Sequence, residues 1–333
     1  MVAVAVLAAL PVLPAESQPR AFEGRTIRIV VGFTPGGGFD TYSRALARHL
    51  GKHLAGKPAV IVENMPGAAS LIAANTVYKA ARPDGLTIVN FHGNQLVGQL
   101  LGREGIEFDA RKFVWLGVPV RDNVVCALTR ASGIGTVEQW MAARTPVKLG
   151  GVGPGDTTHD TARVLQAALG LPIQLVRGYK GTAEIRLAAE SGEVAGGCWQ
   201  WESVKVTWRK ALDAGEIAIV LQATAKPLPE LPRVPLALDL ARTEDARQLV
   251  RAAVIVPSAI SRLYAVAPGT PPDRVQALRA AFLETVRDPE FLADARQAKL
   301  DVDPIPGEEL AGLVEELFRL DPAIVAKLRE ILR

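Results

Sequence analysis

The hydrophobic residues of this chain form short apolar runs that alternate with longer amphipathic stretches. A β-rich run at 26–33 is followed by similar runs within 59–70 and 84–94, and turn residues end each of them. Nearly continuous apolar runs are typical of strands buried on both faces of a parallel sheet. Helical periodicity follows each turn. Three successive strand–turn–helix units predict an α/β domain with a mainly parallel sheet.

The same alternation begins again after residue 122. Further strands are predicted within 122–130, 147–151, 173–179, 192–203 and 217–224, with a helical tail after 270. The pattern predicts two lobes that face each other across a cleft. Because no low-complexity linker separates them, we expect crossing strands to join the lobes. We predict that one lobe contains residues 24–122 and 225–333, and the other residues 123–224.

Composition adds limits to this picture. The 333 residues are 49% hydrophobic and carry a formal net charge of +3, without the run of Lys and Arg that marks a nucleic-acid-binding protein. The first 14 residues are apolar, and Ala15 and Ser17 resemble positions around a signal-peptidase site. We therefore expect residues 1–17 to be an export signal and the mature protein to be soluble and periplasmic. The alternative is a buried N-terminal strand or helix, because no basic residue precedes Arg20.

Three consecutive glycines, 36–38, join the first strand to a helix that Asp40 or Thr41 is expected to cap. Such a run presents backbone N–H groups beside a helix N-terminus, which is an anion site that needs no cationic side chain. It is not a P-loop, because Gly38 and Phe39 stand where Lys and Ser or Thr are required. Asp40 would repel a polyphosphate but leave room for a carboxylate. The alternative is a glycine turn that only packs helix on strand.

A second glycine-rich loop at 150–160 also joins a strand to a helix, with Thr157, Thr158 and His159 at the helix start. Two helix N-termini from two lobes suit a small molecule that carries carboxylates at its ends. Domain closure would bury both charged groups.

The segments 27–50, 60–89, 150–170, 176–194 and 264–282 together resemble the periplasmic substrate-binding proteins of tripartite tricarboxylate transporters, the Bug-type receptors. The resemblance implies an α/β, two-lobed periplasmic-binding-protein fold of the type II-like, Venus-flytrap kind. It implies a monomeric receptor without enzymatic activity, catalytic residue, cofactor or metal. Such a receptor captures a small carboxylate, often a di- or tricarboxylate, and delivers it to the membrane subunits of the transporter.

The resemblance also implies that backbone N–H groups and ordered waters hold the ligand at loops 35–40 and 153–159. Together with the residue chemistry it gives the following candidate ligand-binding residues: Thr34, Pro35, Gly36, Gly37, Gly38, Phe39, Asp40, Ala68, His92, Asn94, Gly153, Gly155, Asp156, Thr157, Thr158, His159, Tyr179, Trp199 and Gln200. The chain departs from the family pattern at Phe39, at 156–158, and at 197–203.

Trp199 and Trp201 alternate on a predicted strand, so both should point to one face of it. Facing the cleft, they would stack on an apolar ligand body; the alternative is hinge or core packing. Phe39 is also bulky, and few cationic side chains lie near the loops, Lys180 being the clearest. Together with the tryptophans, these features favour an aromatic carboxylate or a dicarboxylate with an apolar body over citrate as the ligand.

Three further features leave alternatives open. Cys126 and Cys198 lie on strands that should pass near the hinge, either bonded or as two buried thiols. His49 and His53 are one helical turn apart, but the sequence supplies no third metal ligand near them. A hydrolase is excluded because there is no Gly-x-Ser-x-Gly motif. The remaining alternatives to a transport receptor are a cytosolic enzyme of a phosphorylated or carboxylated substrate and a receptor that feeds a sensor kinase.

Overall fold

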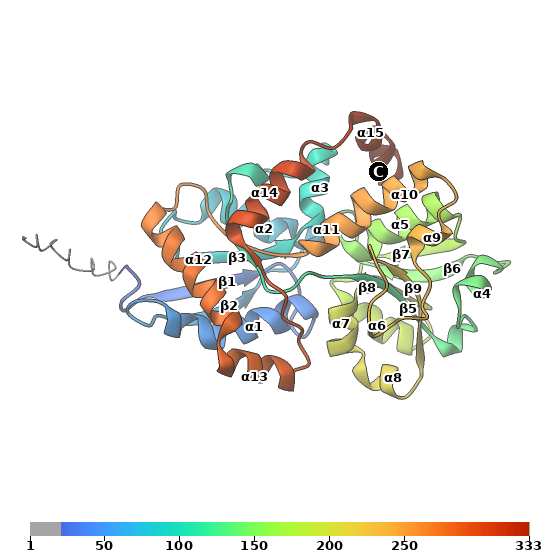
Figure 1. Ribbon diagram of the computed structural model, residues 1–333, viewed down its shortest axis with the longest axis horizontal. Coiled ribbons are helices and arrows are strands. Elements are labelled where there is room, and N and C mark those ends of the chain that lie inside the picture. The colour runs from blue at the N-terminus through green and yellow to red at the C-terminus, as the bar shows by residue number, and fades with distance from the viewer. Residues whose placement is uncertain (1–20, 333) are drawn as a thin grey trace, which may run out of the picture.

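The computed structural model describes residues 21–332, and the predicted export signal at 1–17 lies outside them. The chain forms two lobes placed side by side, each an α/β sandwich around one mixed sheet (Figure 1). This agrees with the predicted two-lobed α/β fold.

The first lobe contains a six-stranded sheet. Its order is β11-β4-β10-β3-β1-β2. Strands β1, β2 and β3 are parallel, whereas β10 runs antiparallel to β3 and β4. The strands are β1 (Thr26–Val31), β2 (Ala59–Asn64), β3 (Thr87–His92), β4 (Val114–Val118), β10 (Arg262–Val266) and β11 (Ile305–Pro306).

The second lobe contains a five-stranded sheet of order β7-β6-β8-β5-β9. Strand β6 is parallel to β7 and β8, and β5 is antiparallel to β8 and β9. The strands are β5 (Val124–Thr129), β6 (Val147–Gly151), β7 (Ile173–Arg177), β8 (Gly196–Gln200) and β9 (Ile217–Ala223).

The two sheets share one topology. The strand order β2-β1-β3-β10-β4 of the first sheet can be aligned with the order β7-β6-β8-β5-β9 of the second. In this alignment the one antiparallel strand, β10 in the first sheet and β5 in the second, has the same position. Strands β1 and β6 are therefore equivalent, and so are the two glycine loops that follow them. Ligands of open α/β sheets bind at the carboxyl ends of such strands.

Helices cover both faces of each sheet (Figure 1). The helices around the first sheet are α1 (Gly38–Leu50), α2 (Leu71–Ala80), α3 (Asn94–Leu100), α12 (Pro272–Arg287), α13 (Pro289–Gln297) and α14 (Gly307–Leu317). Those of the second lobe include α4 (Val137–Met141), α5 (Thr157–Leu169), α6 (Thr182–Glu190), α7 (Trp201–Thr207), α8 (Arg209–Asp213), α9 (Ala237–Leu240) and α10 (Glu244–Val250).

The chain crosses between the lobes after β4 and again through the π-helical turn 251–255 and α11 (Val256–Ala259), as Figure 1 shows. Helix α10 packs against α5 before this second crossing, and the last helix, α15 (Pro322–Ile331), contacts both α5 and α10. Helices α9, α10 and α15 therefore pack with the second lobe, although they fall within residues 225–333, which we predicted for the first lobe. The exact lobe boundaries remain a prediction.

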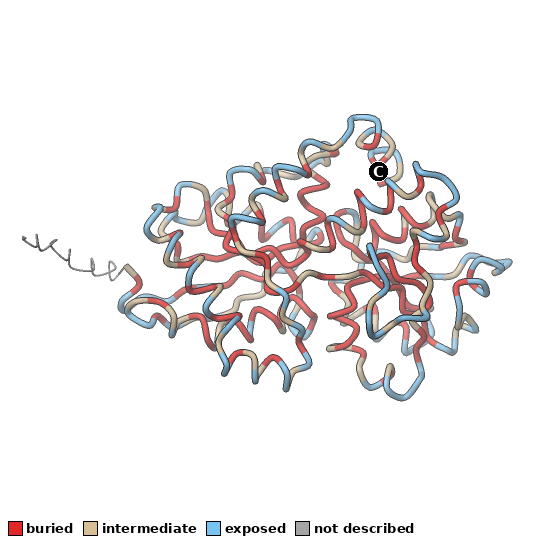
Figure 2. The backbone as a smooth tube through the Cα atoms, viewed as in Figure 1, coloured by how far each residue is buried: buried red, intermediate tan, exposed pale blue. Residues whose placement is uncertain are grey.

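Buried residues follow the central strands of both sheets and the crossing segments between them (Figure 2), whereas the edge strand β2 has none. One apolar cluster runs from the first sheet into the second, a second cluster lies under α1 and α12, and a third lies beneath α6 and α7. The cores of the two lobes are therefore continuous on the side where the chain crosses.

Two details of the predicted elements are wrong. Helix α1 begins at Gly38 with Gly37 at its N-cap, so neither Asp40 nor Thr41 caps it. Strand β8 ends at Gln200 and α7 begins at Trp201, so the strand does not extend through residue 203.

Cys126 and Cys198 form a disulfide. They lie directly opposite each other on the antiparallel strands β5 and β8, and the bond joins residues 72 apart in the sequence. It settles the alternative between a bond and two free thiols. Disulfides persist in oxidising compartments and are rare in the cytosol.

Candidate functional site

The two glycine loops have the same construction. In each, a proline is followed by a glycine with a left-handed backbone, Gly36 at φ +83° and Gly155 at φ +89°. A buried aspartate of the following helix accepts the N–H of that glycine: Asp40 bonds Gly36 at 3.0 Å, and Asp160 bonds Gly155 at 3.1 Å. The side-chain-to-backbone bonds fix both loops in place without consuming the N–H groups at the helix starts.

Asp40 therefore supports its loop from behind. Its carboxylate also accepts from Arg44 Nε at 2.9 Å and from Asn64 Nδ2 at 2.9 Å. Although burial opposes ionisation, these donors hold the pKa of Asp40 below its ordinary value. The charge is compensated locally, so Asp40 does not exclude an anion from the loop.

A narrow pocket lies between the lobes at the two loops. The space inside it that the centre of a water molecule can reach is about 20 Å³. The first lobe contributes Phe33, Thr34, Gly37, Gly38 and Phe39, and the second contributes Asp156, Gly181, Thr182, Gln200 and Ser203. None of these lining residues is Lys or Arg.

Three helices of nine residues or more begin at this pocket: α1 after Gly37, α5 after Asp156, and α6 after Gly181. Each helix N-terminus carries unpaired N–H groups and a partial positive charge. The three helix starts therefore bring partial positive charge from the backbone to the pocket, and no cationic side chain of the lining adds to it.

A buried polar cluster connects the lobes beneath the pocket. His92 Nδ1 accepts the N–H of Asn94, which leaves the ring proton on Nε2, 2.6 Å from Thr157 Oγ1. Gln200 Nε2 donates to Thr157 Oγ1 and to Ser261 Oγ, both at 2.8 Å. Burial lowers the pKa of His92 to about 3, so the ring is neutral. The cluster joins α5 and β8 of one lobe to β3 of the other.

Arg262 lies behind the first loop and is fully buried. It forms an ion pair with Asp122 in the first crossing segment and donates to Ser203 Oγ at 2.8 Å. Its guanidinium also lies over the rings of Phe39 at 5.3 Å and Tyr42 at 4.7 Å. Arg262 thus joins the crossing segment, α1 and α7.

Residues 42–329 match the family model described as the tripartite tricarboxylate transporter family receptor. The chain belongs to this family. Its members are periplasmic solute-binding receptors and not enzymes, and they work with tripartite transporters.

Curated relatives are similar over most of their length. A UPF0065 protein in the gbd 5'region of Cupriavidus necator is 29% identical over 96% of this chain and 92% of its own. Another UPF0065 protein, from Agrobacterium vitis, is 30% identical over 69% of this chain and 67% of its own.

Solved structures share the fold. The periplasmic binding protein BugD has a TM-score of 0.73 at 22% identity and covers 93% of this chain and 98% of its own. Rhodopseudomonas palustris MatC with bound malate has a TM-score of 0.71 at 22% identity, covering 94% and 100%. R. palustris Rpa4515 with adipate has a TM-score of 0.73 at 23% identity, covering 92% and 98%.

The structure divides the candidate residues of this receptor into three groups and two single residues. Six line the pocket: Thr34, Gly37, Gly38, Phe39, Asp156 and Gln200. Three line a wider neighbouring pocket that shares Phe33 with the first: Ala68, Gly153 and Tyr179. Eight lie in the loops or are buried beneath them: Pro35, Gly36, Asp40, His92, Asn94, Gly155, Thr157 and Thr158. His159 is buried and bonds Asp160 at 2.8 Å. Trp199 lies apart from both pockets.

The tryptophan interpretation is therefore corrected. Trp199 is fully buried and stacks on Trp208, with the ring centroids 5.5 Å apart. Trp201 is the first residue of α7 and its indole N–H donates to Glu230. Trp199 therefore packs in the core, which was the alternative to facing the cleft. The aromatic side chains that line the pocket are Phe33 and Phe39.

Sequence reasoning missed Phe33, Gly181, Thr182 and Ser203 of the lining. Gly181 and Thr182 carried a usable signal, because a glycine before the helical run 182–190 is a third loop-to-helix junction. Ser203 carried no such signal in the sequence, because it reaches the pocket only through the turn from β8 into α7.

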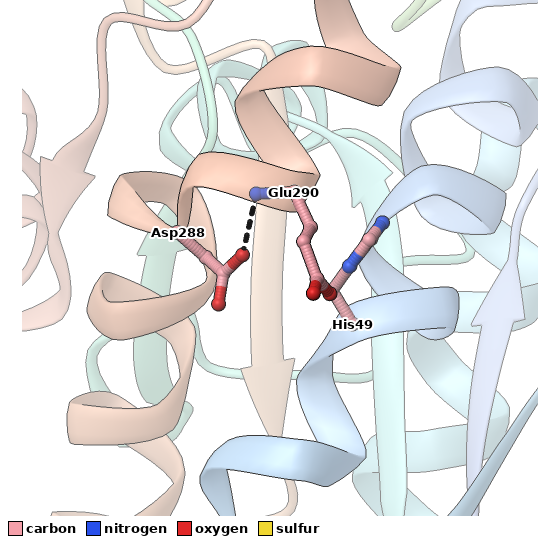
Figure 3. A group of neighbouring side chains, drawn as sticks. All are labelled: His49, Asp288 and Glu290. Carbon is pink, nitrogen blue, oxygen red and sulfur yellow. Dashed lines mark hydrogen bonds between the residues drawn. The ribbon is translucent and has the colours of Figure 1, made fainter.

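A group of possible metal ligands lies outside the cleft, at the end of α1 (Figure 3). His49 lies near Asp288 and Glu290, which supply the acidic groups that the sequence did not reveal next to the histidine. However, Lys52 Nζ is 2.9 Å from Asp288 and 2.6 Å from Glu290. An ammonium group already occupies the position between the two carboxylates and pairs with both. We therefore interpret the group as an ion-pair network between α1 and the α12–α13 junction.

A second charge cluster, centred on the buried Lys205 and Glu202, spans the lobes at the cleft edge. Lys205 Nζ on α7 contacts Glu202 at 2.9 Å, and it also pairs with Asp301 of the first lobe. Tyr42 donates its hydroxyl to the Asp301 carbonyl at 2.9 Å. Burial, with the neighbouring Asp301 carboxylate, raises the pKa of Glu202 to about 8. The pKa of Asp301 is lowered and that of Lys205 is raised. At neutral pH Glu202 is therefore protonated between two charged partners.

This arrangement predicts a pH-dependent contribution to stability. The pKa of Glu202 is higher in the folded protein than its ordinary 4.5, so its stabilising contribution is complete below 4.5 and is lost as the pH rises through about 8. Relative to Glu202→Gln, which stays neutral, the wild type should lose unfolding free energy between about pH 5 and pH 9. Denaturant titrations of both proteins measure this difference, with Glu230→Gln as the control at an exposed acid of the same cluster. A difference that stays constant over this range would contradict it.

Proposed function

We propose that this protein captures a small carboxylate in the pocket between its lobes and delivers it to the membrane subunits of a tripartite transporter. The ligand carboxylate accepts hydrogen bonds from the backbone N–H groups at the start of α1. Closure of the second lobe then covers it with α5 and α6.

The observation that carries this proposal is the convergence of three helix N-termini on a pocket lined without Lys or Arg. Backbone donors in this arrangement stabilise a single small anionic group. A polyphosphate would bring several charges into a pocket that offers no cationic side chain, and burying an uncompensated charge is very costly. The geometry therefore favours a carboxylate.

Family membership and the fold also support a carboxylate as the ligand. Two proteins of this fold are described with malate and with adipate, which are small dicarboxylates. Their identity to this chain is low, so they support the class of ligand and leave its identity open.

The proposed function also requires that the protein is exported from the cytoplasm. We infer that residues 1–17 direct the chain to the periplasm, where it acts as a soluble monomer. The disulfide between β5 and β8 supports an oxidising compartment. None of the helices within residues 21–332 is both long and apolar enough to cross a membrane.

Ligand entry requires the lobes to separate. The pocket is too narrow for a dicarboxylate as it stands, and residues from both lobes form its walls. Opening would break the bonds that Ser203 and Thr157 make across the cleft. Binding should then couple to domain closure, as in hinge-type receptors.

A carboxylate panel tests the proposed function. Thermal-shift measurements on the mature protein should show stabilisation by one or more carboxylates of two to eight carbons. At a ligand concentration about 100 times the dissociation constant, the gain is about 2.7 kcal/mol. Nucleotides and sugar phosphates are the matched comparison. Stabilisation by a phosphorylated compound, with none by any carboxylate, would overturn the proposal.

The two adjacent glycines at the start of α1 give a sharper test. A Cβ at Gly38 would collide with Ser203 Oγ and lie 2.8 Å from Arg262 Nη2, whereas a Cβ at Gly37 would have no neighbour closer than 3.8 Å. Gly38→Ala should therefore obstruct closure and lower carboxylate affinity about ten-fold, which corresponds to about 1.4 kcal/mol. Gly37→Ala should change it less than about three-fold.

Calorimetry on both variants measures the difference, with circular dichroism to establish that each is folded. The double variant Gly38→Ala/Ser203→Gly removes the colliding hydroxyl and should recover part of the lost affinity. Equal affinities for the two single variants would show that the lobes do not close over Gly38.

A further inference from the structure

Asp156 is the one acidic side chain among the lining residues of the pocket. It is 4% exposed and occupies the N-cap of α5. One carboxylate oxygen, Oδ1, accepts the N–H of Thr158 at 2.9 Å and also its hydroxyl. Among residues 21–332, no hydrogen-bond donor reaches the other oxygen, Oδ2. Capping thus uses half of the carboxylate and leaves the other half unpaired beside the pocket.

The surroundings do not supply a cation for that oxygen. Asp160 and His159 are the titratable groups that act electrostatically on Asp156, and they bond each other at 2.8 Å. Arg103 lies 3.5 Å from Asp160, and Arg262 is paired with Asp122. Burial raises the pKa of Asp156 to about 6, so most of the group is still ionised at pH 7.5. An ionised carboxylate oxygen that lines the pocket without a protein donor is available to a hydrogen-bond donor of a ligand, and covering it with an apolar or anionic group would be costly.

The cap alone does not require this residue. In the first lobe, the equivalent junction between β1 and α1 has Gly37 at the N-cap, and no side chain caps that helix. The shared topology therefore accommodates a helix start without a carboxylate. The two ends of the pocket consequently differ in charge: backbone N–H groups at one end and an unpaired acidic oxygen at the other.

We propose that Asp156 selects ligands that carry a hydrogen-bond donor, an ammonium or a hydroxyl group, in addition to the carboxylate that the glycine loop holds. The preferred ligand class is an amino or hydroxy monocarboxylate. A plain dicarboxylate of the same length would place its second charge against Asp156. This inference rests on the proposed function. It replaces the expectation of an aromatic carboxylate or a dicarboxylate with an apolar body, which the tryptophans and Phe39 had suggested.

Matched ligand series test it at pH 7.5 by calorimetry on the mature protein. Each unbranched dicarboxylate of three to six carbons is compared with monocarboxylates that have the same number of carbons. These monocarboxylates lack the second carboxylate and carry instead an amino or a hydroxyl group on either the α or the terminal carbon. We expect an amino or hydroxy member to bind about ten-fold or more tighter than the dicarboxylate of its length.

Asp156→Asn provides the matched variant. The amide oxygen can still accept from Thr158 and so keep the cap, while the amide N–H₂ turns a donor toward the pocket. This variant should lose at least ten-fold in affinity for the amino ligand and gain affinity for the dicarboxylate. Asp156→Ser, which keeps a capping oxygen without charge, serves as the second variant if Asp156→Asn does not fold, and it should lose the same preference.

The outcomes separate this inference from the function on which it rests. Tightest binding to a plain dicarboxylate in the wild type would overturn the role of Asp156 and leave the receptor function standing. Equal losses for all ligands in both variants would reduce Asp156 to a helix cap and also overturn it. Failure of every carboxylate to bind would overturn both.

Discussion

The closed arrangement of the two lobes depends on one buried ion pair. Arg262 on β10 and Asp122 in the first crossing segment are both fully buried in their side chains. A charged pair removed from water must find its remaining partners within the protein, and breaking such a pair by removing one member typically costs 3–5 kcal/mol. Burial lowers the pKa of Arg262 to about 10, so it stays charged at neutral pH. Its partners are consequently held in place around it.

Those partners include the parts of the site that must meet. Phe39 and Tyr42 lie against the guanidinium from α1, and Ser203 accepts from it on α7 of the other lobe. The first glycine loop is therefore supported from behind by the same residue that contacts the opposite lobe. The shared sheet topology positions the two glycine loops, because the loop after β1 and the loop after β6 lie at equivalent ends of their sheets.

Much of this arrangement could be predicted from local sequence. The glycine loop at 36–38, the second loop at 150–160, and most of the parallel strands lie where periodicity and turn residues predict them, since these signals act over a few residues. The contributions of Arg262 and Ser203 could not be predicted, because they depend on residues distant in the sequence that meet only in the assembled fold. The tryptophan interpretation failed for a local reason. Alternation along a strand holds only while the strand continues, and the chain turns into α7 directly after Gln200.

The central claim is that backbone N–H groups of the first glycine loop hold the ligand carboxylate. Nuclear magnetic resonance of the ¹⁵N-labelled protein, titrated with a carboxylate that stabilises it, tests this most directly. The account predicts that the amide protons of Gly37 and Gly38 shift strongly downfield and exchange more slowly with solvent when the ligand binds. Saturating binding that leaves both resonances in place, with the large shifts elsewhere, would contradict it.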